Sequence, residues 1–268
     1  MNKLRLIALV CIMMASTMLS AFAQDYKQVE NICYRSTCDA YQAERCILDV
    51  YYPTNLQNCP VIIWFHGGGL VGGNKFIPAE LKESGYVVVA ANYRFMSKVP
   101  ITECIRDAAA VVNWVVQHAS EYGGNASSIA IAGHSAGGYL TSMIGLDKQW
   151  LGEYGLDPDS LMLLAPYSGQ AVTHYEQRRL MGMSELIPLV DELAPMHHMR
   201  PGLPPMLIIS GDRELELFGR YEEQAYFWRM LRLNGNQNVY LYELQGYDHG
   251  AMASPAHHIL KQYINKHL

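Results

Sequence analysis

Several features that would point to other classes of protein are missing from this sequence of 268 residues. It contains no internal repeat, no low-complexity tract and no convincing linker, which argues against a repeat array or a string of domains. It has no excess of positive charge, since its formal net charge is -5, and this argues against nucleic acid or anionic membranes as partners. None of the cysteine spacings resembles a zinc site.

The single long apolar run, near the N-terminus, is short for a membrane span. Lys3 and Arg5 precede the run LIALVCIMMASTMLS, and small residues follow it up to Ala23. A basic start, an apolar middle and a small-x-small end are typical of a secretory signal peptide. We therefore expect residues 1–23 to be a signal peptide cleaved after Ala23, and the chain to be secreted or periplasmic, without stable membrane insertion. A retained anchor is the alternative.

Cysteine is scarce, and its six residues are unevenly placed. Five of them follow the predicted signal peptide: Cys33, Cys38, Cys46, Cys59 and Cys104. In an oxidising compartment this clustering is compatible with one or two disulfides near the N-terminus, while an odd count leaves at least one thiol unpaired.

The sequence does contain a regular alternation of strand-like and helix-like segments. Half of the residues are hydrophobic, enough for one large core in a single domain over residues 24–268. Short apolar runs are typical of strands that are buried on both faces of a parallel sheet. Such runs, or alternating polarity, predict strands over 45–53, 60–66, 85–93, 127–133, 159–166, 204–210 and 237–244. Helical spacing predicts helices over 100–121, from 135 onward, near 219–233 and near 255–267.

This alternation predicts an α/β fold with a mostly parallel sheet and helices on both faces. Two segments do not follow it. Residues 25–44 read as polar and irregular. The stretch 167–200 has no clear periodicity and is rich in Met, Tyr and His, so we expect it to be a small lid-like insertion.

The stretch SIAIAGHSAGGYL at 128–140 places one serine among glycines where a strand changes to a helix. Gly133, Ser135 and Gly137 form a G-x-S-x-G pattern, which can hold a serine hydroxyl on a sharp turn at the end of a strand. An ordinary turn of small residues is the alternative. Ser135 is therefore the candidate nucleophile, and the amide of Ala136, at a helix N-terminus, is a candidate oxyanion donor.

The sequence HGGG at 66–69 follows another buried strand. Glycines at this point can aim backbone N–H groups into a cavity, so Gly67 and Gly68 are predicted to complete an oxyanion hole with Ala136. A flexible glycine-rich loop is the alternative. The presence of both motifs at strand ends, in the order that a hydrolase needs, favours the catalytic interpretation.

A base is expected after the last strand, in GYDHGAM, where His249 stands in the chain order of serine, acid and histidine. His66 and His134 lie inside the glycine motifs and are expected to shape the turns. The remaining candidates read as surface pairs: His197–His198 and His257–His258.

Together these motifs resemble the α/β-hydrolase superfamily, and specifically its esterase branch with the HGGG oxyanion motif. That branch includes hormone-sensitive-lipase-like carboxylesterases and bacterial feruloyl- or acetyl-esterase-like proteins. The similarity covers about residues 45–268 and rests on VIIWFHGGGLVGG, ANYR, RDAAAVVNWV, GHSAGG and GYDHG. It implies a serine carboxylesterase in which Ser135 is the nucleophile, His249 the base and the oxyanion donors are those named above. It implies no metal or organic cofactor.

The acid should follow the strand that ends at Ser210–Gly211. Three carboxylates come next, Asp212, Glu214 and Glu216. The spacing usual in this fold places the acid three residues after the glycine, so Glu214 is the predicted acid, although the family more often has Asp. Asp212 is the alternative, with turn formation as its other role.

Substrate contacts are expected in the 167–200 stretch, with Tyr167 as a candidate, and in the loop that begins at Leu70. Aromatic rings can stack on a sugar or a feruloyl ring, and methionine adapts to irregular acyl groups, whereas packing of this segment onto the core is the alternative. We expect a small-molecule or carbohydrate-linked ester as substrate, with feruloyl or acetyl esters of plant polysaccharides as the hypothesis. A formamidase or amidase of the same fold, or a non-catalytic binding protein, are the alternative functions.

Overall fold

The computed structural model describes residues 25–36 and 39–267, and the signal peptide predicted over 1–23 lies outside these ranges. Its strands are β1 (Tyr26–Cys33), β2 (Ile47–Pro53), β3 (Cys59–Phe65), β4 (Val87–Ala91), β5 (Gly124–His134), β6 (Leu163–Tyr167), β7 (Met206–Gly211) and β8 (Val239–Leu244). Within the described residues they form one sheet in the order β1-β2-β4-β3-β5-β6-β7-β8. β2 is antiparallel to both neighbours, and all other pairings are parallel. The predicted mostly parallel sheet is confirmed.

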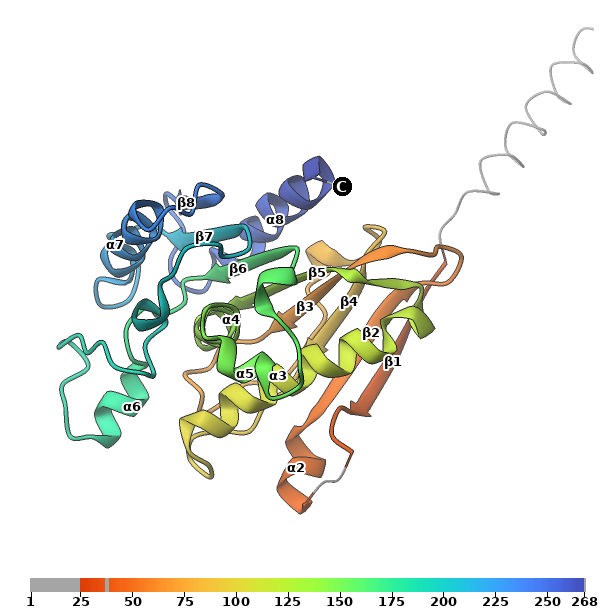
Figure 1. Cartoon of the computed structure of the whole chain (residues 1–268), viewed down its shortest axis with the longest axis horizontal. Helices are drawn as coiled ribbons and strands as arrows, with labels where there is room; N and C mark the ends of the chain where they lie inside the picture. Colours follow the sequence, from red (N-terminus) through yellow and green to blue (C-terminus); the bar gives the residue numbers. More distant parts are fainter. Residues whose placement is uncertain (1–24, 37–38, 268) are drawn as a thin grey trace, which may run out of the picture.

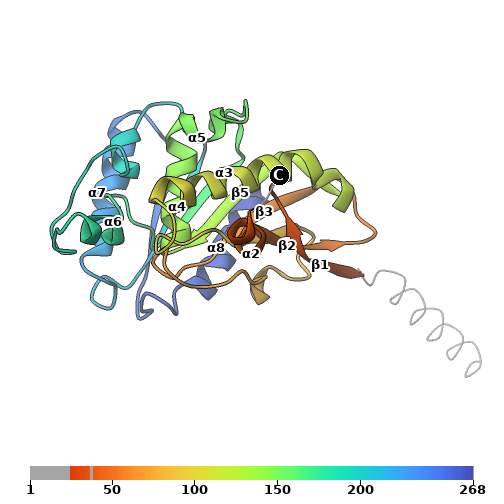
Figure 2. The same cartoon turned by 90° about the horizontal axis from the view of Figure 1, so that it is seen from below.

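Helices cover both faces of this sheet. They are α2 (Ala40–Arg45), α3 (Ile101–His118), α4 (Ala136–Leu146), α5 (Lys148–Gly152), α6 (Tyr175–Leu180), α7 (Arg220–Leu233) and α8 (Ala253–His267). Figures 1 and 2 show α3, α4 and α5 on one side of the sheet and α8 on the other. None of the helices within 25–36 and 39–267 is long and apolar enough to cross a membrane.

The apolar run of β3 explains why both faces are covered. Alternate side chains of a strand point to opposite faces. Val61 and Ile63 accordingly lie in the core beneath α3, α4 and α7, while Ile62 and Trp64 lie in the core beneath α8. A strand that is apolar at every position can therefore bury all of its side chains only between two helical layers.

The expectation of an irregular segment over 25–44 is wrong, because it contains β1 and α2. β1 is an edge strand with mostly exposed side chains, and it is held by backbone pairing with β2. Such a strand needs no apolar alternation, so the sequence pattern gives no sign of it. α2 begins with a capping box in which Asp39 accepts from the Gln42 amide and the Gln42 side chain accepts from the Asp39 amide.

The cysteines of the described residues limit the predicted disulfides. Cys46, Cys59 and Cys104 are free thiols buried in the core. Burial, reinforced by the nearby Asp107, raises the pKa of Cys46 to about 12. A second disulfide would need one of these thiols, so the expectation of two disulfides near the N-terminus is wrong. Cys38 lies outside the described residues.

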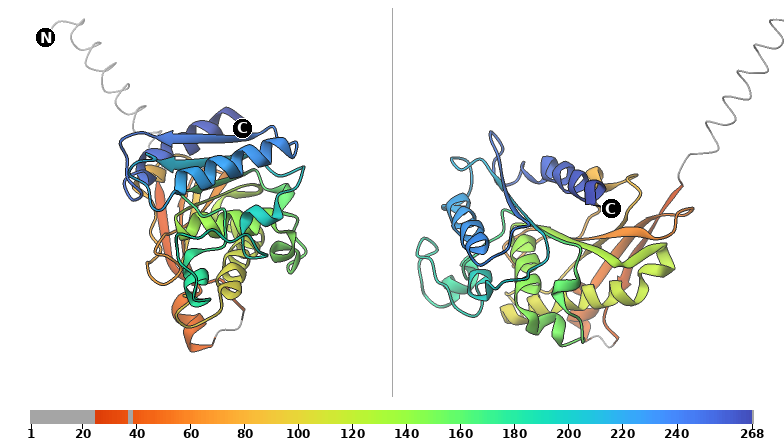
Figure 3. Two further views of the ribbon diagram at one scale, coloured as in Figure 1. Left: turned by 90° about the vertical axis from the view of Figure 1, so that its left-hand side faces the viewer. Right: turned by 45° about the horizontal axis from the view of Figure 1, so that its top comes forward.

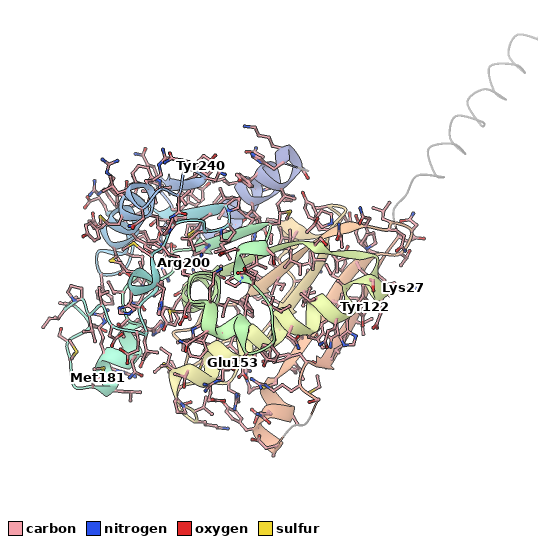
Figure 4. The ribbon with its side chains drawn as sticks, viewed as in Figure 1. Lys27, Tyr122, Glu153, Met181, Arg200 and Tyr240 are labelled. Atoms are coloured by element: carbon pink, nitrogen blue, oxygen red, sulfur yellow. The ribbon has the colours of Figure 1, made fainter. Side chains whose placement is uncertain are left out.

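The segment between β6 and β7 projects beyond the sheet (Figure 3) and carries α6 and the 3₁₀ turn η4 (Pro195–His198). Met181, labelled in Figure 4, lies at its outer part and is 52% exposed. The first turn of α7 holds the base of this segment: Glu223 Oε1 accepts from the amides of Ala171 and Val172, and Gln224 Nε2 donates to Gly169 O at 2.8 Å. That the segment acts as a lid stays a prediction.

Two of the motifs that suggested the resemblance meet in a buried ion pair. Arg94, from ANYR, donates from Nε to Asp107 Oδ2 and from Nη2 to Asp107 Oδ1, both at 2.8 Å, and Asp107 comes from RDAAAVVNWV. The Asp107 side chain is fully buried, and Arg35 also donates to it. This pair ties the loop after β4 to α3, so these motifs serve the fold.

Replacing Asp107 by Asn should lower the free energy of unfolding by about 3–5 kcal/mol, because the buried Arg94 would keep only the partly exposed Glu103 as its countercharge. Urea unfolding followed by circular dichroism measures the change. Asp157→Asn is the matched control, since Asp157 pairs with Lys148 in an exposed position, and its effect should be far smaller. Equal effects of the two substitutions would show that the Arg94–Asp107 pair stabilises the fold no more than an exposed ion pair does.

Candidate active site

Ser135 occupies a strained turn between β5 and α4. Its backbone has φ 54° and ψ -115°, a conformation that residues other than glycine rarely adopt. The Ser135 amide donates to Tyr167 O at 2.8 Å, which fixes the turn against β6. A Cβ added at Gly133 would overlap the carbonyl of Gly137, and one added at Gly137 would overlap the carbonyl of Phe65. The glycines of the G-x-S-x-G pattern are therefore required by close backbone contacts.

The structure brings the predicted nucleophile and base together. His249 lies in the loop between β8 and α8, and its Nε2 is 2.9 Å from Ser135 Oγ. Its other ring nitrogen, Nδ1, is 2.7 Å from Oε2 of Glu216. Hydroxyl, imidazole and carboxylate thus form one hydrogen-bonded line.

The acid in this line is neither Glu214 nor Asp212, so both predictions of the acid are wrong. Residues 212–216 form a helical turn, in which the Glu216 amide donates to Asp212 O at 2.9 Å. This turn carries Glu216 back over the end of β7 and leaves Glu214 exposed. Asp212 instead accepts from the amides of Glu214 at 3.0 Å and Gly246 at 2.7 Å. Asp212 therefore has the turn-forming role that was its alternative.

The Glu216 side chain is fully buried and receives several hydrogen bonds. Besides His249, Oε1 accepts from the Gly211 amide at 2.9 Å and from Ser168 Oγ, and Oε2 accepts from the Leu217 amide at 3.2 Å. Burial alone would raise the pKa of Glu216, but the hydrogen bonds from His249 and Ser168 outweigh it and lower the pKa to about 2. The carboxylate is therefore ionised at neutral pH.

Sequence reasoning did not identify Ser168. It follows β6, is buried, and has a positive φ of 44°. While its Oγ donates to Glu216, its carbonyl accepts from Arg220 of α7. A serine just after a strand carries no pattern of its own, so only the fold reveals this contact.

His134 supports the base. Its Nε2 is 2.6 Å from the carbonyl oxygen of His249, and the two rings lie 4.8 Å apart. Burial, and then the neighbouring His249, lower the pKa of His134 to about 4. At neutral pH His134 is therefore uncharged and donates from Nε2 to that carbonyl, which fixes the His249 loop without adding positive charge beside it.

The HGGG loop folds over Ser135. A Cβ added at Gly67 would lie 3.3 Å from Ser135 Cβ, and one added at Gly68, whose φ is +117°, would overlap the carbonyl oxygen of Gly72. Within the part of the chain that the structure describes, the amides of Gly67 and Gly68 donate to no acceptor. Ala136 is the first residue of α4. These three amides stay the predicted oxyanion donors.

The two predicted substrate contacts are wrong, because both side chains are fully buried. Leu70 has a φ of 61° and packs into the core on the α3 and α4 face, while its carbonyl accepts from the Met96 amide at 2.8 Å. Tyr167 packs against Trp64, at 5.7 Å between ring centroids, in the core beneath α8. Tyr167 contributes to the site only through the carbonyl that holds Ser135.

Exposed apolar side chains lie on three loops that follow strands β3, β7 and β8. They are Val71 and Phe76 after β3, Leu215, Leu217 and Phe218 after β7, and Tyr247 after β8. A cavity of about 440 Å³ opens beside Phe218, between the β6–β7 segment and α7, with Val190 and Tyr226 in its wall. Among residues 25–36 and 39–267, no group of three or more His, Cys, Asp or Glu side chains is arranged to hold a metal ion.

Comparisons with known proteins find esterases among those that resemble this chain. Residues 48–162 match the family model BD-FAE. Over 251 residues the chain is 25% identical to Esterase LipC of Mycobacterium tuberculosis, with 82% of this chain and 62% of LipC covered. The chain thus spans less than two thirds of the length of that relative.

Two solved structures share the fold. One is titled as a truncated form of a carbohydrate esterase from gut microbiota, with a TM-score of 0.71, 17% identity and coverage of 90% of this chain and 95% of that one. The other is Thermogutta terrifontis esterase 2 phosphoramylated by tabun, with a TM-score of 0.69, 21% identity and coverage of 91% and 95%. The chain has the α/β-hydrolase fold, and the proteins that it resembles include esterases.

Three histidines, of which His66 and His257 are buried and His134 is partly buried, make stability depend on pH. Burial lowers the pKa values of His66, His134 and His257 to about 4. The prediction that His257 lies at the surface is wrong, since it packs between Trp64 and Tyr167. Below pH 6.5 these histidines are protonated in the unfolded chain but stay neutral in the folded chain. The free energy of unfolding therefore decreases as the pH falls towards 4.

Each of these histidines should add a slope of about 1.4 kcal/mol per pH unit to the free energy of unfolding between pH 6 and pH 4.5. Urea unfolding across this range measures the total slope. His257→Leu should reduce it by one histidine's share, while His258→Leu, at the exposed neighbour, should leave it unchanged. A slope unaffected by His257→Leu would contradict the assignment.

Glu216→Gln should slow the labelling of Ser135 by a fluorophosphonate probe by about 10³-fold, because the imidazolium formed at His249 would lose its countercharge. Glu214→Gln is the matched control and should change the rate less than about twofold, since Glu214 is exposed. Mass spectrometry of the labelled peptide measures both rates. The reverse ranking would restore Glu214 as the acid.

Proposed function

We propose that this chain is a carboxylic ester hydrolase that works through an acyl-enzyme formed on Ser135. The observation that carries the proposal is the position of His249, with Nε2 2.9 Å from Ser135 Oγ and Nδ1 2.7 Å from Glu216 Oε2. The esterases among its relatives support the same class of reaction.

The hydrogen-bond directions determine the first step. Since the ionised Glu216 accepts from Nδ1–H, the neutral ring of His249 leaves the lone pair of Nε2 for the proton of Ser135. Ser135 Oγ then attacks the ester carbonyl carbon. The alcohol leaves with the proton returned by His249, and water cleaves the acyl-enzyme by the same route.

Two neighbours of His249 favour the positive charge that forms on its ring. Glu216 stabilises the imidazolium of His249, because it stays ionised while buried. His134 is uncharged, so it holds the loop of His249 without opposing the positive charge that forms there. Both effects favour proton transfer from Ser135.

The oxyanion would be held by the amides of Gly67, Gly68 and Ala136. The closeness of Gly67 to Ser135 supports this role, as do the unused amides of Gly67 and Gly68 and the position of Ala136 at the start of an eleven-residue helix. Backbone donors need no reorganisation as charge develops, which makes them effective in the transition state.

For the substrate we propose feruloyl or acetyl esters on plant polysaccharides, hydrolysed outside the cytoplasm. The signal-peptide pattern of residues 1–23 supports export. The structural neighbour described as a carbohydrate esterase supports a carbohydrate as the alcohol part of the ester. The exposed apolar side chains on the loops after β3, β7 and β8, Phe218 among them, suit an aromatic acyl group.

Ser135→Ala should abolish hydrolysis of p-nitrophenyl acetate without changing the thermal unfolding midpoint by more than a few degrees, since only the attacking oxygen is lost. Ser127→Ala, at an exposed position in β5, is the matched control and should keep wild-type activity. Wild-type turnover by Ser135→Ala would disprove the mechanism.

A substrate panel separates the finer alternatives. The wild-type protein should hydrolyse methyl ferulate or acetylated xylan as well as p-nitrophenyl esters. Activity on short simple esters alone would remove the carbohydrate substrate, and turnover of N-formylkynurenine in its place would favour a formamidase.

A further inference from the structure

The hydroxyl of Tyr175 lies against the oxyanion loop. Tyr175 begins α6, in the segment between β6 and β7, yet a Cβ added at Gly69 would overlap its Oη and lie 3.3 Å from its Cζ. Gly69 is the third glycine of HGGG and has a φ of +64°. The two residues are far apart in sequence, so this contact joins the segment directly to the loop that covers Ser135.

The hydroxyl of Tyr175 is available for further hydrogen bonds. Tyr175 is half-buried, and within the described part of the chain its Oη makes no hydrogen bond; only its amide does, to Gln170 Oε1 at 3.1 Å. Burial raises the pKa of Tyr175, so the phenol is neutral and can both donate and accept. Water or a ligand can reach this hydroxyl, because Tyr175 is only partly buried.

The ring that carries the hydroxyl is held rigidly. It stacks on His174 with centroids 4.7 Å apart, and His174 packs edge-on against Tyr139 of α4 at 5.2 Å. Burial holds the pKa of His174 well below its usual range, so this stack carries no charge. Tyr139 in turn donates to Leu193 O at 2.7 Å. Ser135, Ala136 and Tyr175 are therefore positioned by the same helix, α4.

We propose that Tyr175 determines specificity by hydrogen bonding, through its Oη, to a hydroxyl group on the alcohol part of the ester, as in a partly acylated sugar. The inference rests on the proposed ester hydrolysis at Ser135. An ester whose carbonyl oxygen faces Gly67 and Gly68 extends along the same loop towards Gly69, where Oη stands. A neutral phenol that can donate and accept matches an alcohol hydroxyl, which does the same.

Two acetate esters of similar size test this role. Methyl xyloside monoacetate carries free hydroxyls on its alcohol ring, and cyclohexyl acetate carries none. Tyr175→Phe keeps the ring and its stack on His174 but removes Oη. We expect kcat/KM for the xyloside ester to fall about five- to tenfold, mainly through KM, and kcat/KM for cyclohexyl acetate to stay within about twofold. Tyr242→Phe, at an exposed tyrosine of β8, is the control and should change neither.

Each other outcome overturns the proposal. Equal losses on both esters would assign Tyr175 to support of the loop, and no loss on either would mean that Oη does not meet the substrate. If the wild-type protein hydrolyses both esters, the proposed function stands whatever Tyr175→Phe does. If it hydrolyses p-nitrophenyl acetate but neither of these two esters, the role of Tyr175 fails while the proposed ester hydrolysis at Ser135 stands.

The contact itself has an independent test. Gly69→Ala should impair hydrolysis of cyclohexyl acetate, because its Cβ meets Tyr175 Oη at a strained φ. In the double variant Gly69→Ala, Tyr175→Phe the nearest ring carbon is 3.3 Å away, so part of the loss should be restored. Strictly additive effects would mean that the two residues do not touch.

Discussion

The close approach of α4 to the sheet is the constraint on which the site depends. The carbonyl of Gly137 lies where a side chain of residue 133 would be, and the carbonyl of Phe65 lies where a side chain of residue 137 would be. This contact leaves Ser135 no room for a relaxed backbone, and Tyr167 holds its amide. The surrounding packing maintains the strain, and the result is a hydroxyl at the rim of the sheet, within reach of a histidine from a distant loop.

A buried negative charge is the second requirement. Glu216 has no contact with solvent, yet it stays ionised because amides, a serine hydroxyl and His249 all donate to it. His134, close to the same base, is kept neutral by burial. Two titratable groups beside His249 are thus held in opposite states, the buried Glu216 charged and the partly buried His134 uncharged. In the proposed reaction both states would favour a proton on His249 without movement of the protein.

The sequence predicted what local patterns encode and missed what the tertiary structure decides. Ser135 and His249 stand in short motifs at strand ends, and the topology of parallel strands brings such ends together. Glu216 was passed over because the prediction relied on the spacing usual in this fold, whereas a helical turn after β7 brings Glu216, two residues beyond Glu214, to His249. Leu70 and Tyr167 were misplaced because the face to which a side chain points depends on backbone torsions, which composition does not reveal.

The first turn of α7 touches both halves of the site. Arg220 binds the carbonyl of Ser168, whose hydroxyl binds Glu216, while Glu223 and Gln224 bind the backbone at the base of the segment that carries Tyr175. The segment that carries Tyr175 and the carboxylate beside His249 are therefore both anchored to the first turn of α7. A graft that exchanges this segment for that of another enzyme would disturb the acid unless residues 220–224 were transplanted with it.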